Sequence, residues 1–200
     1  MKKVDRIKLI IKRLEEIYPD TPIPLNHQNS FTLLVAVVLS AQSTDKKVNE
    51  LTKDLFKVAQ APLEMYKLGE EKIYNYIKQL GLAKTKAKNI YNLSKIIVEK
   101  YNHIIPNSFK ELESLPGVGH KTASVVMSQA FGVPAFPVDT HIHRLSQRWG
   151  LTSGKSVKQT EEDLKKLFPK YLWNKLHLQI IFYGREYCSA RGCNGTNCKL

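Results

Sequence analysis

Residues 115–123, with the sequence LPGVGHKTA, constrain the fold more than any other segment of the chain. Gly117 and Gly119 permit a tight turn, and apolar residues with helical spacing begin directly after it. Upstream, Ser108 and Glu111 have the spacing of a capping box, so a short helix is expected to lead into the turn. The segment therefore predicts two helices joined by a hairpin. The second helix would offer unpaired backbone N–H groups to an anion such as a DNA phosphate.

A single lysine stands beside this hairpin. Lys121 comes two residues before the first member of an apolar stripe at helical spacing, and two residues are about 200° around a helix. Its amine should therefore point away from the core, where it could act as a nucleophile. The alternative is a plain turn between helices, because Gly-X-Gly is common there. The stripe consists of Ala123, Val126, Met127 and Ala130.

Residues 137–144 (PVDTHIHR) follow the lysine and open another helix. Asp139 or Thr140 is expected to be the N-cap of this helix, and on that interpretation the aspartate has a structural role only. His141 and His143 invite a metal interpretation together with the aspartate. We expect no metal site here, because side chains two residues apart on a helix face different directions.

Taken together, these segments resemble the endonuclease III branch of the helix-hairpin-helix DNA glycosylases. The matching segments are 39–45 (LSAQSTD), 115–123, 138–141 (VDTH) and 184–188 (GREYC). In that family the lysine at the Lys121 position is the nucleophile, and the carboxylate at the Asp139 position is its essential partner. A similar glycosylase that removes adenine opposite damaged guanine lacks the lysine, so Lys121 argues against that relative.

The resemblance implies a bifunctional enzyme of base excision repair. It would remove oxidised pyrimidines from duplex DNA and cleave the abasic strand by β-elimination. Two alternatives stay open: a helix-hairpin-helix module that only binds DNA, and a monofunctional glycosylase in which Asp139 activates water. The implied DNA contacts are Gln42, Leu82, Lys84, Gly117, Gly119, His120, Thr140, Arg144, Arg185 and Arg191. Among them, Gln42 would fill the gap left by an extruded nucleotide, and Leu82 would wedge between bases.

The resemblance also implies an all-α fold of two helical domains with the active site in the cleft between them. The central domain would span residues 22–132 and contain the helix-hairpin-helix at about 108–130. The second would combine residues 1–21 with 133–200. Within the central domain, residues 31–39 are almost continuously apolar. Periodicity cannot distinguish a buried strand from a helix here, but the flanking helical patterns favour a core helix.

Three lysines at alternate positions follow residue 83. Lys84, Lys86 and Lys88 cannot all share one helical face. They belong either to a solvated helix start or to a group of phosphate contacts. Both interpretations keep all three side chains exposed.

The charge balance favours a polyanionic partner. Thirty-one Lys and Arg residues against eighteen Asp and Glu residues give a net charge of +13, and such a surface attracts DNA in a salt-dependent way. A ribosomal or membrane-surface protein would also fit this charge. Because no apolar run approaches the roughly 20 residues that cross a bilayer, and no signal-peptide core follows Met1, we expect a cytoplasmic monomer, nucleoid-associated if bacterial.

The three cysteines lie at 188, 193 and 198, in a loop that resembles a degenerate form of the family's cluster site. Many members hold a [4Fe–4S] cluster with four cysteines spaced C-x6-C-x2-C-x5-C. Cys188 and Cys198 match the first and third positions, whereas Gly195 occupies the second. We therefore expect the cluster to be absent or incomplete, and Cys193 to join the other two as a metal ligand only if a fourth lies beyond Leu200. The family's catalysis needs no cofactor.

Overall fold

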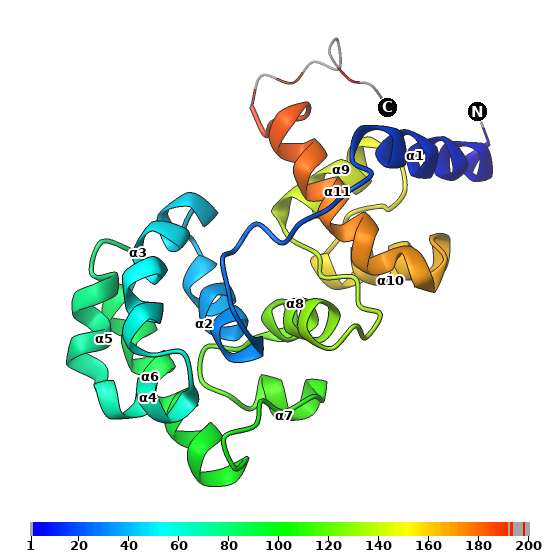
Figure 1. Cartoon of the computed structure of the whole chain (residues 1–200). Coiled ribbons are helices and arrows are strands. Elements are labelled where there is room, and N and C mark those ends of the chain that lie inside the picture. The colour runs from blue at the N-terminus through cyan, green and yellow to red at the C-terminus, as the bar shows by residue number, and fades with distance from the viewer. Residues whose placement is uncertain (1, 192, 194–197, 199–200) are drawn as a thin grey trace. The chain divides into compact units, whose positions relative to one another are not determined.

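The computed structural model describes residues 2–191, 193 and 198, and in these residues it contains helices and turns but no β-strand (Figure 1). The predicted all-α class is confirmed. The chain divides into two compact units, which we call unit 1 (1–22 and 132–200) and unit 2 (23–131). Unit 1 contains α1 (Lys3–Ile17), α9 (Thr140–Arg148), α10 (Val157–Leu167), the 3₁₀ turn η1 (Lys170–Leu172) and α11 (Trp173–Glu186). Unit 2 contains α2 (Ser30–Ser40), α3 (Asp45–Val58), α4 (Pro62–Leu68), α5 (Glu70–Ile77), α6 (Ala83–Lys100), α7 (Phe109–Glu113) and α8 (His120–Ala130).

Helix α2 forms the centre of unit 2. Every residue from 31 to 39 is buried, which confirms that this apolar run is a core helix. Its start is fixed locally, because Asn29 Oδ1 accepts a hydrogen bond from the Thr32 backbone N–H at 2.9 Å, and Thr32 Oγ1 accepts one from the Asn29 N–H at 3.0 Å. The buried surface packs against α3, α6 and α8. Helix α2 therefore links the hairpin helix α8 to the rest of unit 2.

Helix α6 is the second organising element of unit 2, and α4 and α5 both pack on it. The expectation that all three lysines near its start are exposed is wrong for one of them. Lys86 is only 4% exposed. It lies four residues before Ile90, so it continues the buried stripe formed by Ile90, Leu93 and Ile97. Helical position, rather than charge, decides its burial.

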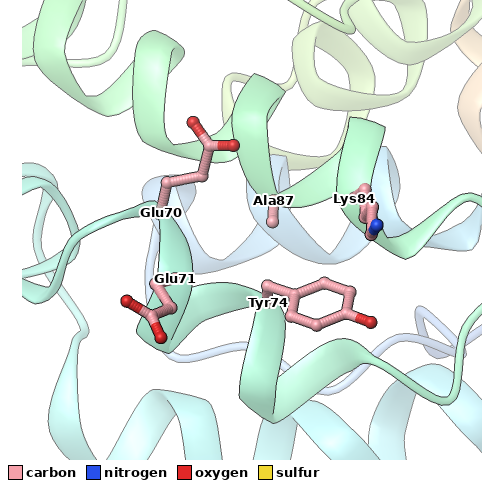
Figure 2. Close-up of a pocket in the computed structure, with 5 residues that line it drawn as sticks. All are labelled: Glu70, Glu71, Tyr74, Lys84 and Ala87. Atoms are coloured by element: carbon pink, nitrogen blue, oxygen red, sulfur yellow. The ribbon is translucent and has the colours of Figure 1, made fainter.

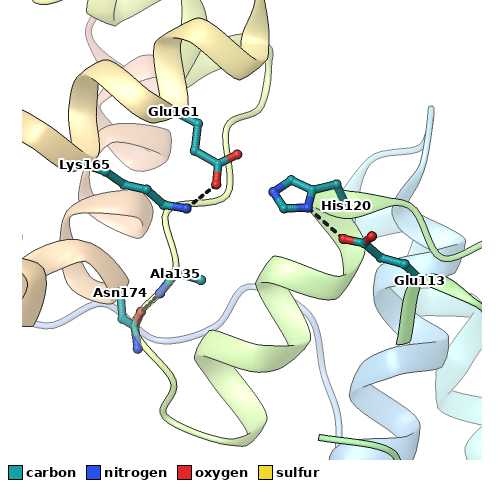
Figure 3. Close-up of polar contacts among 6 residues, drawn as sticks. All are labelled: Glu113, His120, Ala135, Glu161, Lys165 and Asn174. Carbon is teal, nitrogen blue, oxygen red and sulfur yellow. Dashed lines mark hydrogen bonds and ion pairs between the residues drawn. The ribbon is translucent and has the colours of Figure 1, made fainter. Parts of the chain in front are cut away.

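Unit 1 is held together by α11, which packs on α1 and α9. Polar links reinforce this packing. Gln179 is buried and donates to the carbonyl of Tyr18 at 2.9 Å, at the end of α1. Asn174 accepts a hydrogen bond from the Ala135 N–H at 3.1 Å, as Figure 3 shows, and so ties α11 to the segment that leads into α9. None of the helices in the described ranges is long and apolar enough to cross a membrane.

A carboxylate on α10 gives the fold an acid-sensitive contact. Asp163 accepts hydrogen bonds from Thr152 Oγ1 at 2.6 Å and from Gln159 Nε2 at 2.8 Å, and these bonds hold its pKa below the ordinary value. Since the pKa is lower in the folded state, ionised Asp163 stabilises the fold above the unfolded pKa of about 3.9. That contribution is lost as the pH falls through the lowered folded value.

We expect Asp163→Asn to lower the melting temperature at pH 7 by about 1–3 °C, a small effect because the carboxylate is partly exposed. Thermal unfolding followed by circular dichroism at pH 7 and pH 3 would measure it. Glu162→Gln, which removes an exposed charge from the same helix, is the control and should change little at either pH. A difference between Asp163→Asn and wild type that persists undiminished at pH 3 would contradict this assignment.

Candidate active site

The hairpin between α7 and α8 leaves the start of α8 open. Gly117 adopts φ +78°, and a Cβ there would lie 2.8 Å from Asn89 Nδ2, so both backbone conformation and space require glycine. Gly119 is the N-cap of α8, and it brings no side chain to bond the N–H groups of the first turn. A Cβ at Gly119 would meet nothing within 4 Å. Gly119 and His120 are both exposed. The first turn of α8 therefore has the form of an anion site, because its N–H groups have no capping side chain and the helix dipole favours negative charge there.

Lys121 lies in this first turn, and its side chain is exposed. The opposite face of the helix, with Ala123, Val126 and Met127, is buried. The ring of His120, next to the lysine, bonds Glu113 Oε1 through Nδ1 at 2.7 Å (Figure 3) and stacks on Phe109. Glu113 and Phe109 lie on α7, so the histidine ring braces the hairpin. The lysine amine is thus the exposed cationic group on this turn of α8.

Asp139 is the N-cap of α9, and it is one of the two residues that the sequence predicted for this position. Its Oδ1 accepts a hydrogen bond from the Ile142 N–H at 2.8 Å, and the side chain is half-buried. This bond fixes the carboxylate at the helix start through a single oxygen. Thr140, the first residue of α9, is exposed. The structural role of Asp139 is therefore established, and a chemical role would use the same fixed position.

His141 and Arg144 follow Asp139 on α9. Burial lowers the pKa of His141, although the Asp139 charge opposes this, so the imidazole is neutral at neutral pH. Arg144 Nη2 lies 3.2 Å from His141 Nδ1 and donates to the carbonyls of Gly184 at 3.3 Å and Cys188 at 2.8 Å. The guanidinium predicted to contact DNA thus holds the C-terminal end of α11, where carbonyl groups favour a cation.

The remaining predicted DNA contacts lie on exposed surface. Gln42 and Leu82 occupy two turns of unit 2. Lys84 lies at the edge of a pocket of about 360 Å³ that Figure 2 shows, together with Glu70, Glu71, Tyr74 and Ala87. The pocket combines acidic, cationic and aromatic side chains. Arg185 and Arg191, in unit 1, are both exposed.

The thiols gather at the end of α11. Cys188 is 2% exposed, and burial raises the pKa of its thiol while a hydrogen bond from Arg148 Nη1 at 2.9 Å opposes this. Cys193 Sγ lies 3.5 Å from Cys188 Sγ, and Cys198 Sγ lies 3.2 Å from the Tyr183 hydroxyl. Arg148 also donates to the Ser189 carbonyl at 2.8 Å. An arginine on α9 therefore holds the start of the cysteine segment.

Sequence reasoning missed two residues that shape these surfaces, Asn89 and Arg148, and placed a third, Lys86, at the surface although it is buried. The burial of Lys86 could have been found, because it lies at helical spacing from Ile90. The contacts of the other two depend on partners 28 or more positions away in the sequence, and local patterns carry no signal for them.

Comparison with known proteins identifies a family and close relatives of this chain. A family described as "HhH-GPD superfamily base excision DNA repair protein" matches residues 35–170. The chain is 42% identical to endonuclease III of Bacillus subtilis (strain 168), over 100% of this chain and 92% of the relative. It is 44% identical to endonuclease III of Escherichia coli (strain K12), over 96% of this chain and 90% of the relative.

Solved structures give the same result. The structure of a trapped endonuclease III–DNA covalent intermediate matches with a TM-score of 0.94 at 41% identity, covering 100% of this chain and 94% of that chain. A thermostable thymine-DNA glycosylase matches with a TM-score of 0.81 at 22% identity, over 96% of this chain and 90% of that chain, and bears on the fold alone.

The prediction that the [4Fe–4S] cluster is absent or incomplete is wrong. Endonuclease III relatives that match almost the whole chain are [4Fe–4S] proteins, and three cysteines near the C-terminus do not establish that the cluster is missing. The described residues supply three thiols, one fewer than the usual four, and they contain no group of three or more His, Cys, Asp or Glu side chains arranged to hold a metal ion. No catalytic step is assigned to the cluster.

Proposed function

Because the chain belongs to the endonuclease III branch of the HhH-GPD superfamily of base excision DNA repair proteins, we propose that Lys121 is the nucleophile of a DNA glycosylase with abasic-site lyase activity. The enzyme removes oxidised pyrimidines from duplex DNA and cleaves the strand at the abasic site. The observation that carries this proposal is the full-length match to a trapped endonuclease III–DNA covalent intermediate, together with an exposed lysine in the first turn of α8. A covalent intermediate requires a nucleophile, and a neutral amine is a competent one.

The chemistry runs in two stages. First, the neutral amine of Lys121 attacks C1′ of the damaged nucleotide, the C1′–base bond breaks, and the base departs with the bonding electron pair and a proton. The amine then loses one of its two protons, and the C1′–O4′ bond breaks as the sugar ring opens. O4′ takes the bonding pair and a proton, and the nitrogen lone pair forms an iminium between the lysine and C1′ that keeps one N–H. In the second stage the iminium makes the C2′ proton acidic. Its removal breaks the C3′–oxygen bond and releases the 3′ phosphate, which is β-elimination.

Asp139 supports the first stage. We assign two tasks to its carboxylate: it accepts the proton that the attacking amine loses, and it stabilises the positive charge that develops on the sugar as the base departs. The N-cap bond to Ile142 supports this role because it fixes one oxygen of the carboxylate. A fixed carboxylate needs less reorganisation during the reaction.

The remaining predicted contacts serve DNA binding and extrusion. The N–H groups after Gly119, which no side chain caps, and the net charge of +13 favour the phosphate backbone. Gln42 fills the space that an extruded nucleotide leaves and Leu82 wedges between bases opposite the damaged site, which offsets part of the few kcal/mol that extrusion costs. Such an enzyme works where the chromosome is, in the cytoplasm and on the nucleoid if the cell is bacterial.

Borohydride trapping tests the proposal. We expect incubation of the protein with a duplex containing thymine glycol or an abasic site, in the presence of borohydride, to give a covalent protein–DNA adduct on a denaturing gel. The wild-type protein should also nick the duplex. Base release without an adduct or a nick would instead indicate a monofunctional glycosylase. Binding without base release would indicate a module that only binds DNA.

A further inference from the structure

Two exposed turns of unit 2 hold residues in an uncommon backbone conformation. Gln42, between α2 and α3, has φ 54°, and Leu82, at the start of α6, has φ 59°. Residues other than glycine rarely adopt positive φ, and such conformations persist only where the surroundings fix them. The two turns also approach each other, because a Cβ on Gly81 would lie 3.8 Å from the Gln42 carbonyl oxygen.

Lys86 contacts both turns. Its Nζ donates a hydrogen bond to Ser43 Oγ at 2.9 Å, directly after Gln42. Its backbone N–H donates to the Leu82 carbonyl at 2.9 Å, in the first turn of α6. A second link runs in parallel, because Lys47 on α3 bonds Gln79, which precedes the Leu82 turn. One buried side chain and its own backbone thus join the two turns.

The burial of Lys86 is unfavourable for a charged group. Its amine is removed from water, and desolvation lowers its pKa. The partner that the structure gives it is a neutral hydroxyl, which compensates a buried charge less well than a carboxylate does. An apolar side chain of similar length would fill the same space without this cost. Stability therefore does not explain a lysine at this position, and its contact to Ser43 requires another reason.

We propose that Lys86 is a positioning residue that ties the Gln42 turn to the Leu82 turn, so that both side chains enter the duplex as one unit. This inference rests on the proposed function, in which Gln42 fills the gap left by the extruded nucleotide and Leu82 wedges between bases. Without the Lys86 side chain, the Gln42 turn would lose its hydrogen bond to α6 at Ser43, and insertion of one side chain would no longer assist the other.

The test compares Lys86→Met and Ser43→Ala with wild type. We expect each variant to lower the single-turnover rate of thymine glycol release by about 10-fold, within the range of coupling between neighbouring residues. The double variant should be no slower than either single variant, because both remove the same contact. Lys95→Met is the control. It removes a partly exposed lysine of α6 whose ion pair with Glu99, at 3.9 Å, contributes little.

A double-mutant cycle separates positioning from a purely structural role. In the wild-type background the effects of Gln42→Ala and Leu82→Ala should be non-additive, and in the Lys86→Met background they should become additive. A 2-aminopurine base placed opposite an abasic-site analogue fluoresces more strongly when it unstacks. This fluorescence should be lower with Lys86→Met and with Ser43→Ala than with the wild-type protein. Melting temperatures should not fall in Lys86→Met. If Lys86→Met does not fold, Ser43→Ala carries the same comparison.

Three outcomes would overturn the proposal: wild-type base release in Lys86→Met and Ser43→Ala, a slower rate with the Gln42–Leu82 coupling intact, or an unchanged 2-aminopurine signal. Failure of the proposed function looks different, because the wild-type protein would then form no borohydride adduct. The 2-aminopurine signal needs no chemistry, so it would still decide the role of Lys86 in that case.

Discussion

Replacing Lys121 with glutamine is expected to abolish the borohydride adduct and to slow base release by about 10³-fold or more. Losing the nucleophile of an enzyme typically lowers the rate by this much. Glutamine is of similar length and retains polarity, but its amide nitrogen cannot attack C1′ or form an iminium. Because Lys121 is exposed and the buried face of α8 is unchanged, the fold should be retained. Single-turnover release of thymine glycol and adduct formation on a denaturing gel would measure both effects.

Lys110→Gln is the matched control. This lysine is exposed on α7, the helix before the hairpin, so the variant removes the same charge from a neighbouring surface. Its adduct yield should equal that of the wild type, and any weaker DNA binding should be relieved at low salt. An adduct of wild-type yield in Lys121→Gln would exclude Lys121 as the nucleophile. Loss of binding alone would favour the phosphate-contact alternative.

Replacing Asp139 with asparagine should separate the chemical role of this residue from its structural one. Asparagine is as good an N-cap as aspartate, so the bond to the Ile142 N–H and the melting temperature should both be retained. The negative charge is lost, and we expect base release to fall by about 10²- to 10³-fold. Asp139→Ala removes the cap as well, and should lower the melting temperature by roughly 2–4 °C.

Ser156→Ala provides the control for the cap. Ser156 is the N-cap of α10 and accepts a hydrogen bond from the Gln159 N–H at 3.0 Å. Its loss should lower the melting temperature as Asp139→Ala does, but leave base release unchanged. Thermal unfolding and single-turnover kinetics on the four proteins would distinguish the roles. A full rate of base release in Asp139→Asn would restrict Asp139 to capping.

The helices and their starts were predictable because their signals are local. Asn29, Asp139 and Ser156 act through bonds to residues three positions away, and an N-cap depends on little else. The apolar stripe of α8 was also predictable from the sequence, since Ala123 and Val126 are buried as its spacing predicts. These elements needed no information from the rest of the chain.

What could not be predicted depends on long-range partners. Arg144 looks like a free cation in the sequence, yet its hydrogen bonds reach carbonyls 40 and 44 positions away. Lys86 was expected at the surface because it is charged, but the stripe of α6 and the hydroxyl of Ser43 hold it inside. The cluster prediction failed because cysteine count and spacing alone do not decide whether a cluster is held.

Asn89 of α6 packs against Gly117 of the hairpin. It seats the hairpin on α6, the helix that begins next to Leu82. Position 89 lies seven residues after position 82, a rise of about 10 Å along the helix, and this distance is fixed by the helix geometry. If the hairpin grips a phosphate and Leu82 enters the base stack, the spacing between these two contacts is set before DNA binds. The protein would then act as a rigid template, and the duplex would bend to fit it.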